Sequence, residues 1–142
     1  MSTPMPTIPH HDYVYRASLV SCHDADTQTY VLDLGFNVRV RVNIRVLGIN
    51  APELATSEGK VAQQAALSWL MAAGAAEWPF VIASQKAATP IGPDKFGGRW
   101  LAQVWRQSDG QELGAALIAA GQAVAWSGTG PKPVPTPTGA TA

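Results

Sequence analysis

The chain has 142 residues, which is the size of a single domain, and its 46% hydrophobic and 14% charged residues exclude wholesale disorder. Ten basic and ten acidic residues cancel, so no global positive field attracts nucleic acid, although this balance still allows a locally basic face. Cys22 is the only cysteine, which excludes an internal disulfide and fits a reducing compartment.

Residues 1–12 are rich in proline and polar residues and are expected to form a flexible segment. They lack the basic stretch followed by an apolar stretch that defines a secretory signal. Charged, glycine or proline residues interrupt every longer apolar run, which argues against a membrane-spanning helix and a membrane partner. We therefore expect a cytoplasmic protein, and the alanine-rich, lysine-poor composition favours a bacterial or phage origin.

Three strands are predicted in the first third of the chain. Tyr13–Cys22 is rich in Tyr, Val and Leu, residues 23–26 form a turn, and Thr27–Leu34 reads as a second strand. From Phe36 to Val46, apolar residues alternate with mostly basic ones at a period of two. This alternation predicts a third strand with one apolar and one basic face, which ends at Gly48.

A helix is predicted over Glu58–Ala73, with Ser57 as its N-cap and Gly74 as its C-terminal stop. Small residues and Trp69 recur on one of its faces, which allows the helix to approach a sheet closely. Two strands and a second, short helix follow, at Trp78–Gln85, Trp100–Arg106 and Leu113–Ala120.

The order of three strands, a helix, two strands and a helix is typical of a five-stranded barrel of the oligonucleotide-binding (OB) type. We therefore predict a β-rich α+β fold, with one barrel domain over residues 13–127. Residues 128–142 are rich in proline, threonine and glycine and are expected to form a disordered tail. Because such barrels host many functions, the function has to be inferred from particular side chains.

Acidic and amide side chains gather on two of the predicted turns. Asp24 and Asp26 follow the first strand, and Asn50 and Glu53 follow the basic strand. If the barrel joins these turns, their oxygens form a site suited to Ca²⁺. Arg45 would add a guanidinium, and a guanidinium beside a divalent cation neutralises the charge that grows on a phosphodiester under attack. By spacing alone, Asp24 and Asp26 are equally well explained as ordinary turn residues.

Three ordered blocks carry a more specific signal, and they read HDADT at 23–27, RVLGINAPE at 45–53 and DKFGGR at 94–99. They resemble the signature segments of the staphylococcal (micrococcal, thermonuclease) nuclease family. The similarity extends over residues 13–126 and includes the helix and strand from Leu113 to Trp126. The resemblance implies an SNase-like OB barrel that hydrolyses DNA, RNA or both by attack of water, with Ca²⁺ as cofactor, and leaves 3′-phosphate ends. Mg²⁺ or Mn²⁺ are the alternative metals, and we expect a monomer.

The resemblance assigns catalytic roles to Arg45, Glu53 and Arg99. Glu53 matches the general base, and the two arginines match the residues that hold the phosphate. Contacts with the nucleic acid fall on four further positions, which are Lys95, Phe96, Trp126 and Arg41. For Trp126 a place in the core explains the sequence better than a nucleic-acid contact does, and for Arg41 a solvated strand face explains it equally well.

The metal positions fall on Asp26, Asn50 and Ala51, the last through its backbone carbonyl. Asp24 matches an acidic neighbour that does not touch the ion. Asn50 stands where the family has an aspartate, so the site loses a negative charge and Ca²⁺ affinity should fall toward the weak range of about 10⁻⁴ to 10⁻³ M. Phe96 replaces a tyrosine, and the pair Gly97–Gly98 contains one extra glycine before Arg99.

Two functions follow from these observations. The first is metal-assisted hydrolysis of phosphodiesters, because a base between two phosphate-binding arginines serves cleavage and is not needed for binding alone. The alternative is a barrel of the same ancestry that binds nucleic acid or protein and cleaves weakly or not at all. Asn50, the neutral net charge and the expected cytoplasmic location favour this alternative.

Overall fold

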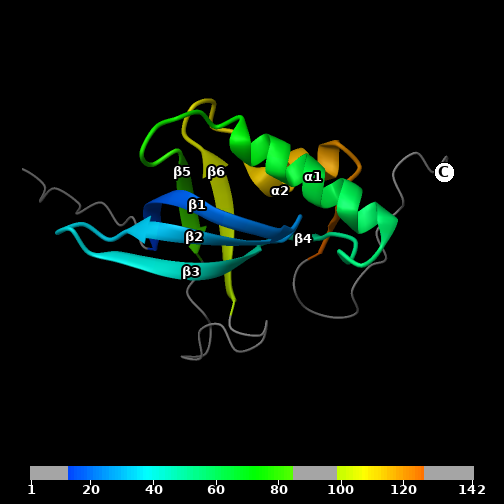
Figure 1. Cartoon of the computed structure of the whole chain (residues 1–142), viewed down its shortest axis with the longest axis horizontal. Helices are drawn as coiled ribbons and strands as arrows, with labels where there is room; N and C mark the ends of the chain where they lie inside the picture. The colour runs from blue at the N-terminus through cyan, green and yellow to red at the C-terminus, as the bar shows by residue number, and fades with distance from the viewer. Residues whose placement is uncertain (1–12, 85–98, 127–142) are drawn as a thin grey trace, which may run out of the picture.

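The computed structural model describes residues 13–84 and 99–126 of the chain (Figure 1). Within these ranges, five strands close into a barrel in the order β1-β2-β3-β6-β5, and β4 and β7 form a separate pair. The helices are α1, Ser57–Met71, and α2, Leu113–Ala119. The strands are β1 Val14–Asp24, β2 Thr27–Asp33, β3 Arg39–Val46, β4 Ile49–Asn50, β5 Phe80–Ser84, β6 Trp100–Arg106 and β7 Val124–Ala125.

The predicted class, a β-rich OB-like barrel with two helices, is confirmed over this part of the chain. The predicted flexible segment 1–12 and the tail 128–142 lie outside the described residues, as do Lys95 and Phe96. Neither α1 nor α2, the helices of the part that the structure describes, combines the length and the apolar character that a membrane crossing needs.

The barrel closes through one parallel contact, between β3 and β6, whereas the other neighbouring pairs are antiparallel. In this pairing Ile44 lies opposite Trp100, and Arg45 lies opposite Leu101. The start of β6 therefore lies beside the end of β3. As a result, Arg99, which directly precedes β6, comes close to residues that are more than fifty positions earlier in the chain.

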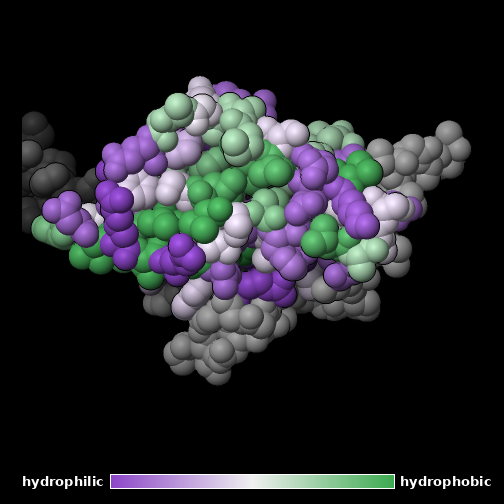
Figure 2. Space-filling view, viewed as in Figure 1, coloured by the Kyte–Doolittle hydropathy of each residue, from purple (hydrophilic) through white to green (hydrophobic). Residues whose placement is uncertain are grey.

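The inward-facing side chains form the core of the barrel, and α1 covers one side of it by packing against β1 (Figure 1). Tyr30 and Phe80 are almost fully buried, and their rings meet edge to face at 5.8 Å. On α1 the small residues Ala62 and Ala66 are buried, as the sequence predicted. Figure 2 shows hydrophobic and hydrophilic residues intermingled on the face that carries β1, β2 and β3.

The third strand differs from its prediction at its start. It begins at Arg39 instead of Phe36, because Phe36 and Asn37 adopt left-handed backbone angles, with φ of 52° and 61°. Burial along β3 follows the alternation only in part. Val40 is 38% exposed, whereas Arg45 is 2% exposed. The alternation therefore indicated the strand but not which of its residues are covered.

Helix and strand ends shift by a few residues from the predictions. The N-cap of α1 is Thr56, whose Oγ1 accepts a hydrogen bond from the amide of Gly59 at 2.9 Å, so the prediction of Ser57 was wrong by one residue. The fourth predicted strand starts at Phe80, two residues after the expected Trp78. Gly74 has a φ of 96°, as expected of a residue that ends a helix.

The resemblance implied a strand between the second helix and Trp126, but β4 and its pairing with β7 were not predicted. Ile49 lies opposite Ala125, and the amide of Trp126 donates a hydrogen bond to the carbonyl of Gly48 at 2.8 Å. Strands of two residues carry no periodicity, so no sequence pattern reveals them. This pair matters for the site, because it places Trp126 beside the segment that follows β3.

Candidate functional site

The acidic turn between β1 and β2 carries Asp24 and Asp26, and both residues are largely buried. Asp24 Oδ1 accepts a hydrogen bond from the backbone amide of Asp26 at 3.2 Å, which tightens the turn. Burial, followed by the contact with the Asp26 carboxyl and its charge, raises the pKa of Asp24 to about 7. The two carboxyl groups are therefore close enough to disfavour a double negative charge.

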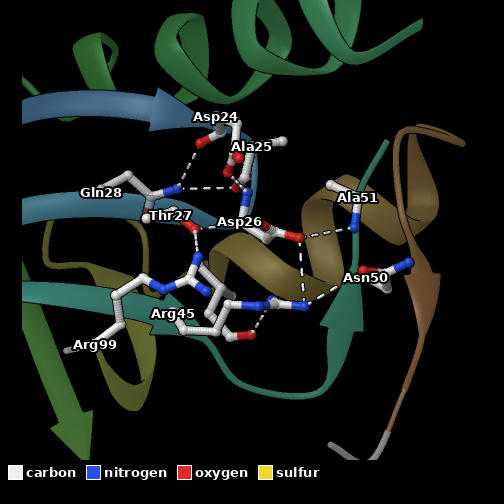
Figure 3. A network of polar contacts seen from close by, with 10 residues as sticks. Asp24, Ala25, Asp26, Thr27, Gln28, Arg45, Asn50, Ala51 and Arg99 are labelled. Carbon is white, nitrogen blue, oxygen red and sulfur yellow. Dashed lines mark hydrogen bonds and ion pairs between the residues drawn. The ribbon is translucent and has the colours of Figure 1, made fainter. Parts of the chain in front are cut away.

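Asp26 lies at the centre of a polar network that joins the two predicted turns (Figure 3). Its Oδ1 accepts a hydrogen bond from the Thr27 hydroxyl at 3.2 Å. Its Oδ2 accepts one from the amide of Ala51 at 2.9 Å and lies 3.4 Å from Arg45 Nη2. The two turns are thus in contact, through Asp26 and Ala51, and Arg45 joins Asp26 to Asn50. The contact of Ala51 is made by its amide nitrogen, and the role of its carbonyl stays a prediction.

Arg45 reaches this network from the end of β3. Nη1 donates to the carbonyl of Val46 at 3.1 Å, and Nη2 donates to Asn50 Oδ1 at 3.4 Å. The guanidinium also lies over the ring of Trp126, 5.7 Å from its centroid. Burial is the main cause that lowers the pKa of Arg45, and the Arg99 charge lowers it further, whereas Asp26, Asp24 and Glu53 raise it. An arginine nevertheless keeps its charge at neutral pH.

Arg99 approaches the same carboxylate from the start of β6. Its Nη1 donates a hydrogen bond to Thr27 Oγ1 at 3.0 Å, and that hydroxyl donates in turn to Asp26 Oδ1. Thr27 thus links the second guanidinium to the acidic turn. Despite the extra glycine before it, Arg99 occupies the expected region. No role had been assigned to Thr27, although it stands inside the first matching block, directly after Asp26.

Glu53 lies in the loop between β4 and α1, and it is exposed. Its carboxylate is near enough to act on the pKa of Arg45. The loop is held by Thr56, whose amide and hydroxyl both donate to the Glu53 carbonyl, at 3.0 and 2.7 Å. A Cβ atom on Gly59 would lie 1.7 Å from that carbonyl oxygen, so α1 approaches the Glu53 backbone at a distance that only glycine permits.

The predicted nucleic-acid residues are placed unevenly. Arg41 is exposed on β3 opposite Val31, on the same side of the strand as Arg45 and four residues before it. Trp126 is half-buried beside Arg45, so part of its ring already serves an internal contact. Lys95 and Phe96 lie outside the described residues. The structure therefore groups Arg45, Arg99 and the acidic turn, and leaves Arg41 at the edge.

The metal-binding capacity of the site is limited by its donors. Among residues 13–84 and 99–126 no cluster of three or more histidine, cysteine, aspartate or glutamate side chains is arranged to hold a metal ion. Two carboxylates and the amide oxygen of Asn50 are present, and all are hard oxygen donors of the kind that Ca²⁺ and Mg²⁺ take. The donor set therefore fits a weakly held oxygen-seeking cation that keeps most of its water.

Comparisons with known proteins add no identification. No protein-family model matches the chain, and a search of curated proteins gives no significant match. The functional argument consequently depends on the geometry of the site and on the resemblance of the three sequence blocks.

Proposed function

We propose that this protein is a metal-dependent endonuclease that hydrolyses phosphodiester bonds of DNA, RNA or both by attack of water and leaves 3′-phosphate ends. One observation carries the proposal. Two arginines, one at the end of β3 and one directly before β6, converge on one carboxylate, since Arg45 lies 3.4 Å from Asp26 and Arg99 reaches it through Thr27. Two guanidinium groups beside an acidic turn form a receptor for one phosphoryl group.

The roles of the side chains follow from their chemistry. Arg45 and Arg99 would donate hydrogen bonds to the non-bridging oxygens of the phosphate and stabilise the charge of the pentacoordinate transition state. Glu53 would accept the proton of the attacking water, whose oxygen forms the new bond to phosphorus. The bond from phosphorus to the 5′ oxygen breaks, and that oxygen takes up a proton as it leaves. The exposed position of Glu53 allows water to reach it.

Asp26 and Asn50 would hold a Ca²⁺ ion, with the carbonyl of Ala51 as a further ligand and Asp24 as the acidic neighbour. A bound divalent cation supplies positive charge next to the phosphate and lowers the pKa of water. In the structure the candidate oxygens of Asp26 and Asn50 both contact Arg45 Nη2. Arg45 would therefore have to share these oxygens with an incoming cation, which agrees with a weak metal site.

The alternative function is a barrel that binds nucleic acid or protein without efficient cleavage. It is favoured by the amide at position 50, where a carboxylate would bind a cation more strongly. In this reading, Arg45 and Arg99 still receive a phosphate, and Glu53 has no catalytic task. Both functions share the same arginines, so cleavage itself has to be measured.

The decisive experiment incubates the protein with single-stranded DNA and with RNA in millimolar Ca²⁺, Mg²⁺ or Mn²⁺, and in chelator. We expect metal-dependent products from the parent, with a reduction on the order of 10² to 10⁴ in Glu53→Gln. Glu77→Gln is the matched control, because Glu77 is an exposed glutamate that pairs with Arg39, away from the acidic turn. Binding without cleavage in every metal would refute hydrolysis and leave the binding barrel.

A further inference from the structure

The backbone of the acidic turn is held by two glutamine side chains that come from two different elements, β2 and α1. Gln63 of α1 donates from Nε2 to the carbonyls of Cys22 and His23, at 3.1 and 3.2 Å. Gln28 of β2 donates from Nε2 to the carbonyls of Asp24 and Ala25, at 3.2 and 2.9 Å. Carbonyls 22–25 are therefore consecutive acceptors of side-chain amides, and we call Gln28 and Gln63 the glutamine clamp.

Gln28 is oriented from inside the barrel. It is fully buried, and its Oε1 accepts a hydrogen bond from the hydroxyl of the equally buried Tyr30 at 3.1 Å. Because an amide oxygen only accepts and the amide NH₂ only donates, this contact leaves the NH₂ group facing the turn (Figure 3). A buried amide is costly unless its hydrogen bonds are made, and here both ends of Gln28 have partners.

The glutamine clamp determines what the turn presents to the rest of the site. The carbonyl oxygens of residues 22–25 accept hydrogen bonds from α1 and from the barrel core. The carboxylate of Asp26 instead contacts Ala51 and Arg45. Two close carboxyl groups repel each other when both are charged, so a turn without these anchors would relax and separate them.

We propose that Gln28 and Gln63 are positioning residues that hold the acidic turn so that Asp26 can bind a cation with Asp24 beside it, and that Gln63 makes α1 part of the site's support. The inference rests on the proposed function, because it assigns Asp26 to a cation. Outer partners of metal ligands typically change affinity by about 10- to 100-fold when they are removed. The side-chain hydrogen bonds of the two glutamines go to carbonyls of the turn and, for Gln28, to Tyr30, so both would act through the turn.

The test compares Gln63→Ala with Gln64→Ala. Gln64 is the next residue of α1 and is exposed, so the two variants make the same change in helix propensity, whereas only Gln63 bonds to the turn. Calorimetric titration with Ca²⁺ should show affinity about tenfold weaker in Gln63→Ala and unchanged in Gln64→Ala. Excess Ca²⁺ should restore cleavage by Gln63→Ala, since its catalytic side chains are intact.

Two further measurements separate positioning from general stability and from the proposed function. Amide hydrogen exchange at Asp26 should accelerate in Gln63→Ala relative to Gln64→Ala, while the melting temperatures of the two variants stay close. Tyr30→Phe removes the hydroxyl that orients Gln28 with little change of volume, and it should weaken Ca²⁺ binding in the same direction.

The outcomes are distinguishable. If the parent neither binds Ca²⁺ nor cleaves, but exchange at Asp26 still accelerates in Gln63→Ala, the nuclease proposal fails while the anchoring of the turn stands. If exchange accelerates and Ca²⁺ affinity stays unchanged, the anchoring has no positioning role and the inference is overturned. Equal behaviour of Gln63→Ala and Gln64→Ala in all measurements would overturn it as well.

Discussion

The chain buries two arginines in different ways, and the difference separates a structural region from a candidate site. Arg106 donates to both oxygens of Asp109, to Gln111 Oε1 at 2.9 Å and to the Trp69 carbonyl at 3.0 Å, and it stacks on the Trp69 ring at 4.4 Å. Arg45 donates to the Val46 carbonyl at 3.1 Å, but its contacts with Asp26 and Asn50 are longer, at 3.4 Å, and it lies 5.7 Å from its aromatic neighbour.

The surroundings of the two guanidinium groups also differ in charge. Asp109 forms an ion pair with Arg106 and so neutralises its charge. The pKa of Arg45 is affected by a second cation, Arg99, as well as by the acidic turn and Glu53. Arg45 also has an opposite-charge partner in Asp26, but a second guanidinium acts on it as well. The contacts of Arg106 are those of a structural ion pair, whereas the surroundings of Arg45 fit the phosphate site that we propose.

The largest expected effect comes from exchanging each arginine for lysine. Arg45→Lys should lower the cleavage rate by on the order of 10² to 10³, because a lysine cannot donate in the planar fork of a guanidinium. Arg106→Lys should lower the melting temperature and leave the cleavage rate of the folded protein nearly unchanged. Initial rates on single-stranded DNA at saturating Ca²⁺, together with thermal melts, check both. Equal loss of activity in the two variants would break the comparison.

A second contrast uses one glycine from each region. In Gly59→Ala, the new Cβ would meet the Glu53 carbonyl oxygen at 1.7 Å, and backbone cannot move aside easily. We expect a destabilisation of about 1 to 3 kcal/mol and reduced cleavage through displacement of Glu53. In Gly114→Ala, the nearest atom is a Glu112 side-chain oxygen at 2.9 Å, which can move without displacing backbone, although the move would weaken the N-cap hydrogen bonds that Glu112 accepts from the amides of Gly114 and Ala115. Urea unfolding should therefore show a smaller loss for Gly114→Ala, and the reverse order would contradict the packing argument.

Asn50→Asp tests the candidate cation site by adding a negative charge beside Arg45. Because Ca²⁺ affinity rises with the number of charged oxygen ligands, we expect about tenfold tighter binding. Asn43→Asp adds the same charge to an exposed part of β3 and should leave affinity unchanged. Isothermal titration of both variants with Ca²⁺ provides the measurement. Unchanged or weaker binding by Asn50→Asp would remove Asn50 from the list of ligands.

The smallest effect is a difference in pH dependence between the two regions. Without a divalent cation, the raised pKa of Asp24, about 7, means that its stabilising contribution is complete below its unfolded-state pKa and is lost as the pH rises through 7. Asp24→Asn keeps the acceptor oxygen but does not titrate, so it does not lose stability in this pH range. Its melting temperature should therefore rise relative to that of the parent between pH 5 and pH 8.

Asp109 should behave in the opposite sense. The hydrogen bond from Arg106 lowers the pKa of Asp109, so its contribution is present above the unfolded-state pKa and is lost as the pH falls through the lower folded-state value. Asp109→Asn should therefore lose stability relative to the parent at neutral pH and lose this difference in acid. If the melting temperature of Asp109→Asn also rises relative to the parent between pH 5 and pH 8, as expected for Asp24→Asn, the electrostatic contrast between the regions is wrong.

The sequence predicted the parts of this protein that depend on neighbouring residues. Alternation at a period of two located β3, and the β6 prediction, Trp100–Arg106, coincides with the strand that the structure shows. Predictions failed by a residue or more where several local solutions compete. Thr56 and Ser57 are both good N-caps, and only the packing of α1 on the Glu53 loop selects Thr56.

The candidate site shows the same division. Asp24, Asp26, Asn50 and Arg45 could be chosen from the sequence, because their residue types and order are visible there. The burial of Arg45, the link from Arg99 through Thr27 and the β4·β7 pair could not, because these contacts join residues far apart in the chain. Gln28 and Gln63 carried no signal, since a glutamine in a strand or helix has no characteristic neighbours.

The amino-acid sequence alone thus determined the fold class and the chemical character of the site, because hydrophobic periodicity and residue type are local properties. Only the tertiary structure decided which charges meet, which arginine is buried and how the acidic turn is held. Those outcomes depend on closure of the barrel through β3 and β6, which places the end of one strand beside the start of a strand far along the chain.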